Sequence, residues 1–155
     1  MKLILYLLLG SLCCVVRSAE LTSEQVIAMT LLGEARGEGK AGMYAVATVI
    51  AQRSINRKLT PKQVCLQSGL VKGRRIHQFS CWNNSDINKP KLRKLLKEHP
   101  NKDYARALAL NITKLERSYS KYSDHYHSRH IKMPYWASNK SHTITIGNHK
   151  FYKLK

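Results

Sequence analysis

The segment GEARGE, residues 33–38, holds the side chain best placed for acid–base chemistry, the carboxyl group of Glu34. Ile27 and Leu31 come seven and four residues before Glu34, so a helix would carry all three on one stripe. A helix normally buries this stripe, and burial raises the pKa of a carboxyl group. Such a group can act as a general acid near neutral pH. The alternative is a structural Glu34 whose charge is balanced by Arg36 or another base.

A second group of interest is the histidine-rich segment around Tyr126. His125 and His127 fall on one side of an extended segment, with His130 close by, as the ligands of some zinc sites do. The sequence has no His-Glu-x-x-His helix, and Asp124 is the only carboxylate near these histidines. We therefore expect no metal and no other cofactor. One or two of the histidines should instead hydrogen-bond a polar ligand or a catalytic group.

Serine or cysteine nucleophiles have little support in the sequence. Ser80 lacks an evident Ser-His-Asp context, and neither Cys65 nor Cys81 has an activating neighbour. In an oxidising compartment two cysteines that enclose a short loop predict a disulfide, so we expect a Cys65–Cys81 bond. The alternative is a pair of buried, reduced thiols.

The start of the chain predicts export. Lys2 is followed by an almost wholly apolar run over residues 3–16 and then by the small residues Ser18 and Ala19. This pattern is typical of a secretory signal peptide over residues 1–19, with an uncleaved anchor as the alternative. Residues 20–155 then form a single domain, located in the periplasm, outside the cell or in the cell wall. No later apolar run is long enough to span a membrane, so we expect no membrane insertion after signal removal.

The remaining chain is strongly basic. Of 27 Lys and Arg residues, two fall in the signal segment, which leaves 25 against nine acidic residues and a net charge of +16. Such a charge is common in nucleic-acid-binding proteins, but the sequence has no nucleic-acid-binding motif. For an exported protein, an anionic surface or wall polymer is the expected partner. We expect a monomer.

Periodicity predicts mostly helices. Thr22 and Gln25 have the spacing of a capping box and begin a helix that runs toward Arg36. The apolar segment 41–55 predicts a central buried helix, and Thr60 with Pro61 begins a short third helix. Residues 69–90 are expected to form a loop, residues 91–97 a cationic helix and residues 103–116 an amphipathic helix.

The last part of the chain changes period. Alternating residues 143–146 and 150–152 flank Gly147 and Asn148, which is a β-hairpin signal. The predicted fold class is therefore α+β, a mainly helical domain with a small β-hairpin near the C-terminus.

Together these motifs resemble the SleB/CwlJ-type cell wall hydrolases, a family that includes spore-cortex-lytic enzymes. The resemblance covers roughly residues 24–152, with the motifs in the family's order. It is carried by residues 33–38, the helix ending Ala51-Gln52-Arg53, Gln78-Phe79-Ser80, His125-Tyr126-His127, Pro134-Tyr135-Trp136-Ala137 and residues 146–152. The chain departs from the family's pattern between Gln67 and His77, where a basic insert contains Lys72, Arg74 and Arg75.

The resemblance implies a lysozyme-like domain that cuts the glycan strands of peptidoglycan. The first glutamate of the family's motif, its catalytic acid, falls on Glu34. The other matching motifs imply substrate contacts from Gln78, Phe79, Ser80, His125, Tyr126, His127 and Trp136. Tyr126, Trp136 and Trp82 are candidates for stacking on sugar faces, with burial of these aromatic rings as the alternative. Glycosidases often use two carboxylates, and Glu38, one helical turn after Glu34, is the possible second one. A lytic transglycosylase needs only one carboxyl group, and Glu34 alone suits that reaction better.

Two further functions remain open. One is an amidase that cuts the stem peptide with a histidine-bound zinc ion, because some members of the family have been described as amidases. The other is a cationic wall-binding protein without enzymatic activity. The products released from peptidoglycan distinguish all three hypotheses.

Overall fold

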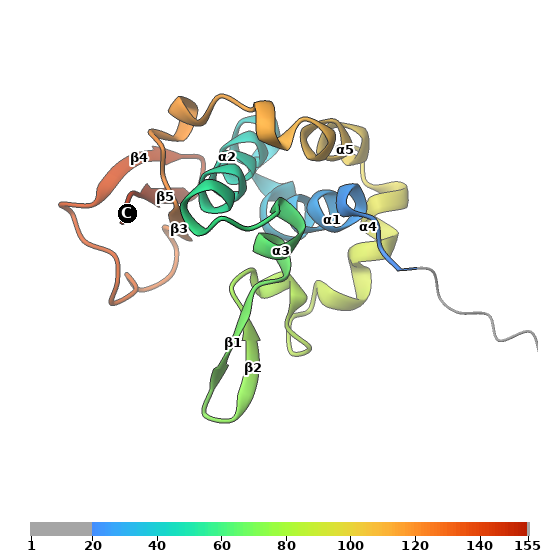
Figure 1. Ribbon diagram of the computed structural model, residues 1–155, viewed down its shortest axis with the longest axis horizontal. Coiled ribbons are helices and arrows are strands. Elements are labelled where there is room, and N and C mark those ends of the chain that lie inside the picture. The colour runs from blue at the N-terminus through green and yellow to red at the C-terminus, as the bar shows by residue number, and fades with distance from the viewer. Residues whose placement is uncertain (1–19, 155) are drawn as a thin grey trace, which may run out of the picture.

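The computed structural model describes residues 20–154, so the predicted signal peptide, residues 1–19, lies outside the described residues. A body of helices carries a small C-terminal sheet on one side and a projecting β-hairpin on another (Figure 1). The mainly helical α+β class is confirmed. In residues 20–154, no helix combines the length and the apolar composition needed to cross a bilayer.

The structure contains five α-helices and five strands in its described part, linked by short 3-10 helices. The α-helices are α1 (Ser23–Ala35), α2 (Gly39–Arg57), α3 (Pro61–Leu66), α4 (Leu92–Glu98) and α5 (Lys102–Leu110). The strands are β1 (Ser68–Val71), β2 (Arg74–His77), β3 (His125–Ser128), β4 (His142–Ile146) and β5 (His149–Tyr152). The 3-10 helices are η1 (Arg36–Glu38), η2 (Ser80–Trp82), η3 (Lys89–Lys91), η4 (Ile112–Lys114) and η5 (Arg117–Ser120).

Helix α1 forms as its capping residues predict. The Thr22 side chain accepts from the Gln25 backbone N–H, and the Gln25 side chain accepts from the Thr22 N–H, which completes the capping box. Thr60 and Gln63 make the same two bonds at the start of α3, where Pro61 occupies the first turn. Both predicted helix starts are confirmed.

Helix α2 is the central element of the core. It is buried nearly all round, as predicted, and packs against α1, α3 and α5. A second, smaller apolar cluster joins Ala45 and Val49 of α2 to Phe151 of β5. Helix α2 therefore connects the helical body to the C-terminal sheet.

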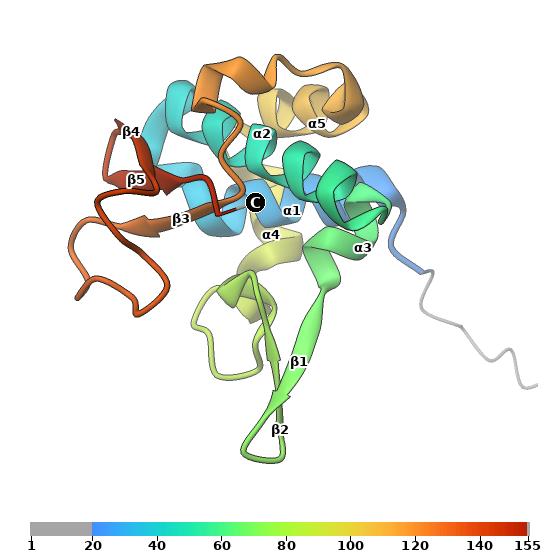
Figure 2. The same cartoon turned by 60° about the vertical axis from the view of Figure 1, so that its left-hand side comes forward.

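The predicted hairpin around Gly147 is confirmed as β4 and β5, and Gly147 adopts the positive φ of 56° that the turn requires. A third strand, β3, pairs with β5 in the antiparallel order β3-β5-β4. Because β5 is central, it holds the histidine segment 125–128 beside α2 (Figure 2).

The loop predicted over residues 69–90 is partly wrong. Residues 68–77 form an antiparallel hairpin, β1–β2, which projects away from the helices in both views (Figures 1 and 2). Its turn residues Lys72 and Gly73 both have positive φ, 48° and 76°, which is the two-residue turn that matches strand twist. The predicted amphipathic helix 103–116 also ends early, at Leu110, with Asn111 following and η4 continuing the chain.

The predicted disulfide is wrong, because Cys65 and Cys81 are both free, buried thiols. Cys65 lies on α3, where its thiol hydrogen-bonds to Thr30. Cys81 lies in η2 and packs directly against Gly33, less than one turn along α1 from Thr30. Both thiols face the C-terminal half of α1 without bonding to each other, and burial raises the pKa of both, that of Cys65 to about 12.

Candidate active site

A cleft of about 350 Å³ lies where α1, α2, η2 and the C-terminal sheet meet. Residues from distant parts of the chain line it: Glu34, Arg53, Gln78, Phe79, Ser80, Tyr126, His127, Ser128, Ile131, Pro134, Trp136 and His149. Seven of the residues singled out in the sequence are therefore brought together: Glu34, Gln78, Phe79, Ser80, Tyr126, His127 and Trp136.

The Glu34 carboxylate is half-buried in the last turn of α1 and is held from two sides. The backbone N–H of Cys81 donates to Oε1 at 3.0 Å, and the Tyr126 hydroxyl donates to Oε2 at 3.0 Å. The Ser80 hydroxyl lies 3.5 Å from Oε1, at the limit of a hydrogen bond. Each carboxylate oxygen has two lone pairs, so these bonds orient the group and leave positions for a proton.

Tyr126 is held in turn by aromatic neighbours. Its ring packs against Phe151 at 5.7 Å, Phe79 at 6.5 Å and the edge of His149 at 4.9 Å between ring centroids. Burial, with the nearby Glu34 carboxylate, raises the pKa of Tyr126 well above its usual range. The tyrosine therefore stays protonated and remains a donor to Glu34.

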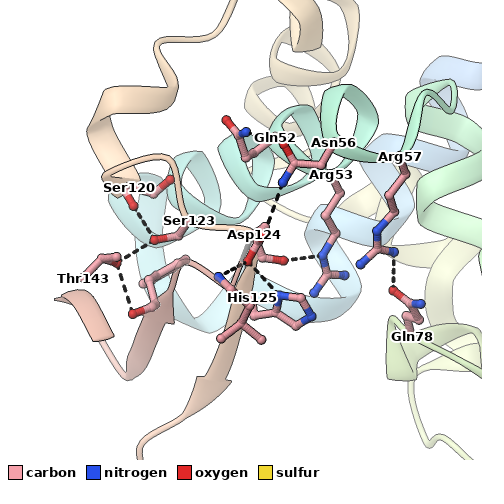
Figure 3. A network of polar contacts seen from close by, with 12 residues as sticks. Gln52, Arg53, Asn56, Arg57, Gln78, Ser120, Ser123, Asp124, His125 and Thr143 are labelled. Atoms are coloured by element: carbon pink, nitrogen blue, oxygen red, sulfur yellow. Dashed lines mark hydrogen bonds and ion pairs between the residues drawn. The ribbon is translucent and has the colours of Figure 1, made fainter. Parts of the chain in front are cut away.

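Arg53 places a buried positive charge in the cleft. It projects from α2, and its Nε donates to the backbone carbonyl of Asp124 at 2.6 Å (Figure 3). Its guanidinium lies over the ring of Phe79, 5.1 Å from the centroid. Burial lowers the pKa of Arg53, which nevertheless stays charged at neutral pH. Its Nη1 is buried and has no hydrogen-bond partner among residues 20–154.

Arg36 does not balance the charge of Glu34. Its Nη1 donates to the carbonyl oxygens of Leu32 and Gly33, both at 3.2 Å, and its Nη2 donates to Asn88 Oδ1 at 2.7 Å. Arg36 thus caps the C-terminal end of α1. The alternative in which Arg36 neutralises Glu34 is wrong.

Gln78 and Ser80 form the wall of the cleft that faces the hairpin. Arg57 of α2 donates to Gln78 Oε1 at 2.6 Å (Figure 3). It also donates to the side chain of Gln67. Phe79 is fully buried, and its ring packs against the guanidinium of Arg53 and the ring of Tyr126.

The opposite wall is aromatic. Trp136 contacts His127 at 5.9 Å, Tyr152 at 5.5 Å and His125 at 5.2 Å between ring centroids. His127 Nε2 hydrogen-bonds to the Tyr152 hydroxyl at 3.0 Å, and its Nδ1 to the Ser128 carbonyl at 2.8 Å. His125 does not line the cleft.

His125 instead bonds to Asp124, with 2.8 Å between Nδ1 and Oδ1, and Asn56 donates to the other carboxylate oxygen at 3.2 Å (Figure 3). Nowhere in residues 20–154 do three His, Cys, Asp or Glu side chains form a group that could hold a metal ion.

Glu38, the possible second carboxylate, lies outside the cleft. Both of its oxygens face Asn148: Oε2 accepts from the backbone N–H at 2.6 Å and Oε1 from Nδ2 at 3.3 Å. Glu38 therefore anchors the β4–β5 turn to the start of α2. Gly147 in this turn lies so close that a Cβ there would be 2.4 Å from Glu38 Oε2.

Five lining residues were not among the sequence-based candidates: Arg53, Ser128, Ile131, Pro134 and His149. Arg53 and His149 are the two that carry titratable groups. Arg53 ends the apolar face of α2, and an arginine at a buried helical position is itself a signal, because buried charge usually has a function. His149 is buried on β5, its Nδ1 has no hydrogen-bond partner within residues 20–154, and burial lowers its pKa. It belongs to the motif 146–152, but only the pairing of β5 with β3 brings its side chain to the cleft, so the motif did not show its place in the site.

Comparison with known protein families gives one match, to the family described as Cell Wall Hydrolase, over residues 37–152. The match begins three residues after Glu34 and includes every other residue that lines the cleft. Searches of curated proteins and of solved structures returned no match. Because the matched segment covers most of the chain, the resemblance seen in the sequence is confirmed. The chain belongs to the cell wall hydrolase family, and it is an enzyme that acts on the cell wall, with peptidoglycan as its implied substrate.

Proposed function

We propose that the protein is a lytic transglycosylase that cuts the glycan strands of peptidoglycan, with Glu34 as both acid and base. One observation carries the proposal: Glu34 is the only carboxyl group among the described residues that line the cleft. Hydrolysis with two carboxylates needs a second one about 5–10 Å away across the sugar. Glu38, the nearest candidate in sequence, has both oxygens directed at Asn148.

In the proposed reaction, Glu34 first gives its proton to the glycosidic oxygen, and the bond from that oxygen to C1 of the muramyl sugar breaks. The positive charge that develops at C1 is then captured by the 6-hydroxyl oxygen of the same sugar. Glu34, now a carboxylate, takes the proton of that hydroxyl as the ring closes. The products are a shortened strand and a 1,6-anhydromuramyl end, without consumption of water.

Two hydrogen bonds hold the Glu34 side chain in place. The Cys81 N–H and the Tyr126 hydroxyl orient its two oxygens, which reduces the reorganisation needed during the proposed reaction. The Arg53 charge stabilises the carboxylate that exists after the first proton transfer.

The cleft walls are proposed to hold the sugars. Trp136 and His127 offer aromatic faces and edges, and Gln78 and Ser80 offer hydrogen-bonding groups on the opposite wall. Access to the wall requires export, and we propose that residues 1–19 serve as the signal peptide.

The test is product analysis by mass spectrometry on purified peptidoglycan, with wild type and Glu34→Gln. The substitution keeps the shape of the side chain and removes the transferable proton. We expect anhydromuramyl products from the wild type and at least about a 10²–10⁴-fold loss in the variant. Reducing muramyl ends would instead indicate hydrolysis, and free stem peptides would indicate an amidase. Near wild-type turnover of Glu34→Gln would show that the assignment of Glu34 is wrong.

A further inference from the structure

A second cavity, of about 400 Å³, lies between strand β2 and the loop that follows Trp82. We call it the hairpin pocket. The polar and charged residues that line it are Arg74, Arg75, His77, Asn83, Asn84 and Ser85, together with Ile76 and Trp82. No acidic residue is among those lining it in the described part of the chain. The pocket is therefore cationic, with amide and hydroxyl groups beside the charges.

The two guanidinium groups are available to a ligand. Arg74 and Arg75 are both exposed, and within residues 20–154 neither is paired with a carboxylate. Arg75 makes one weak contact, to Ser68 Oγ at 3.3 Å. Guanidinium groups in this state bind planar carboxylates with two parallel hydrogen bonds.

Hydrogen bonds hold the residues at the base of the hairpin pocket in place. The backbone N–H of His77 donates to Asn83 Oδ1 at 2.7 Å, and the ring Nδ1 of His77 bonds to the Leu66 carbonyl at 3.1 Å. On the other side, the Trp82 indole N–H donates to Thr30 at 2.9 Å. These bonds fix the base of the β1–β2 hairpin against the loop that starts at Asn83.

The hairpin pocket is adjacent to the cleft that contains Glu34. Residues 78–80 line the cleft, whereas His77, Trp82 and Asn83 line the pocket. Ser80 and Asn83 are three residues apart in the sequence, so their Cα atoms are no more than about 11 Å from each other. A substituent on a sugar in the cleft can therefore extend into the pocket.

We propose that the hairpin pocket binds the free carboxylates of the stem peptide carried by the glycan strand in the cleft. The proposal rests on the proposed function, because it assumes a glycan strand bound beside Glu34. The stem peptide is the part of peptidoglycan that carries carboxylates on a flexible branch, and Arg74 and Arg75 present the complementary charge. The pocket gives the enzyme a preference for strands that still carry their peptides.

The first experiment measures this preference. The values of kcat/KM are compared on glycan strands with intact stem peptides and on strands from which the peptides have been removed. In the double variant Arg74→Gln/Arg75→Gln the ratio of the two values should fall about tenfold, because two exposed Arg–carboxylate pairs are lost. The control Arg93→Gln/Lys97→Gln removes the same charge from α4, far along the chain, and should leave the ratio unchanged.

An equal fall of the ratio in both double variants would mean that net charge alone sets the preference, and the proposal would be wrong. An unchanged ratio in Arg74→Gln/Arg75→Gln would also overturn it. Circular dichroism melting of both variants checks that the hairpin substitutions leave the fold intact.

The second experiment does not depend on the reaction. A soluble disaccharide-peptide is titrated into the full chain by isothermal calorimetry, with the same compound carrying amidated carboxyl groups as its control. Stronger binding of the free acid, lost in Arg74→Gln/Arg75→Gln, supports the pocket even if Glu34→Gln turns out to be active. Equal binding of acid and amide would refute the pocket while leaving the role of Glu34 unaffected.

Discussion

The close contact between Gly33 and Cys81 predicts that Gly33→Ala impairs the enzyme through the position of one backbone N–H. A Cβ at Gly33 would lie 2.6 Å from Cys81 Cβ, 2.9 Å from its Sγ and 3.0 Å from Leu92 Cδ2. Ordinary contacts begin at 3.4 Å, so η2 must retreat by about 0.8 Å, the difference between 3.4 and 2.6 Å. The bond from the Cys81 N–H to Glu34 would lengthen from 3.0 Å to about 3.8 Å and break.

The size of the effect follows from two opposing contributions. Overpacking costs about 1–3 kcal/mol, and replacing a glycine inside a helix returns up to about 1 kcal/mol. The net loss of up to roughly 2 kcal/mol should lower Tm by no more than about 8 °C. Loss of a hydrogen bond to a charged group, about 1.5–3 kcal/mol, should lower kcat by roughly 10- to 100-fold.

The assay is release of soluble fragments from peptidoglycan, with a thermal melt of the same preparation. Gly37→Ala is the matched control, because a Cβ at that exposed position meets nothing within 4 Å. It should retain wild-type activity and stability. If Gly33→Ala retains wild-type kcat, or if Gly37→Ala loses as much, the Cys81 N–H does not position Glu34 in the way described.

Two more predictions concern titratable groups. Cys65 and Cys81 are free, and burial raises the pKa of both thiols. A thiol reagent should therefore react with these two residues only after denaturation, and a reductant should leave Tm unchanged. Rapid labelling of either thiol in the native protein, or a Tm that falls on reduction, would contradict this. Burial lowers the pKa of the His149 imidazole from 6.5 in the folded protein. As the pH falls below about 6.5, the imidazole therefore takes up a proton in the unfolded chain before it does so in the folded chain, and the free energy of unfolding should decrease. In urea titrations His149→Gln should reduce this pH dependence and the exposed control His130→Gln should not; equal slopes in wild type and His149→Gln would refute the assignment.

Much of the fold follows from local signals in the sequence. The capping boxes at Thr22 and Thr60, the apolar segment of α2 and the Gly147 turn each determine an element through short-range chemistry, and each was predicted. The β1–β2 hairpin was missed because its second strand contains Arg74 and Arg75 and shows no apolar alternation. Its turn uses Lys72, a residue that rarely adopts positive φ.

The candidate site was predictable only in part, because side-chain contacts between distant segments leave no local signal in the sequence. Sequence motifs identified seven of the twelve residues that line the cleft, but they could not show which contacts each side chain makes. The cysteine spacing suggested a disulfide, whereas the structure directs Cys81 toward Gly33 and Cys65 toward Thr30. The spacing of Glu38 suggested a second carboxylate, yet α1 ends at Ala35 and η1 turns Glu38 toward Asn148.

The distance between Glu34 and Tyr126 depends on α2, although neither residue belongs to that helix. Glu34 is on α1, which packs on one side of α2, and Tyr126 is on β3 of the sheet that Val49 and Phe151 join to the other side. Arg53 follows Val49 by four residues and therefore lies on the same face of α2, where it lines the cleft in which Glu34 and Tyr126 meet. One buried helix thus fixes the two groups that bond at 3.0 Å and supplies the positive charge beside them. The buried arginine at the end of the apolar face of α2 therefore brings a positive charge from the core to the cleft.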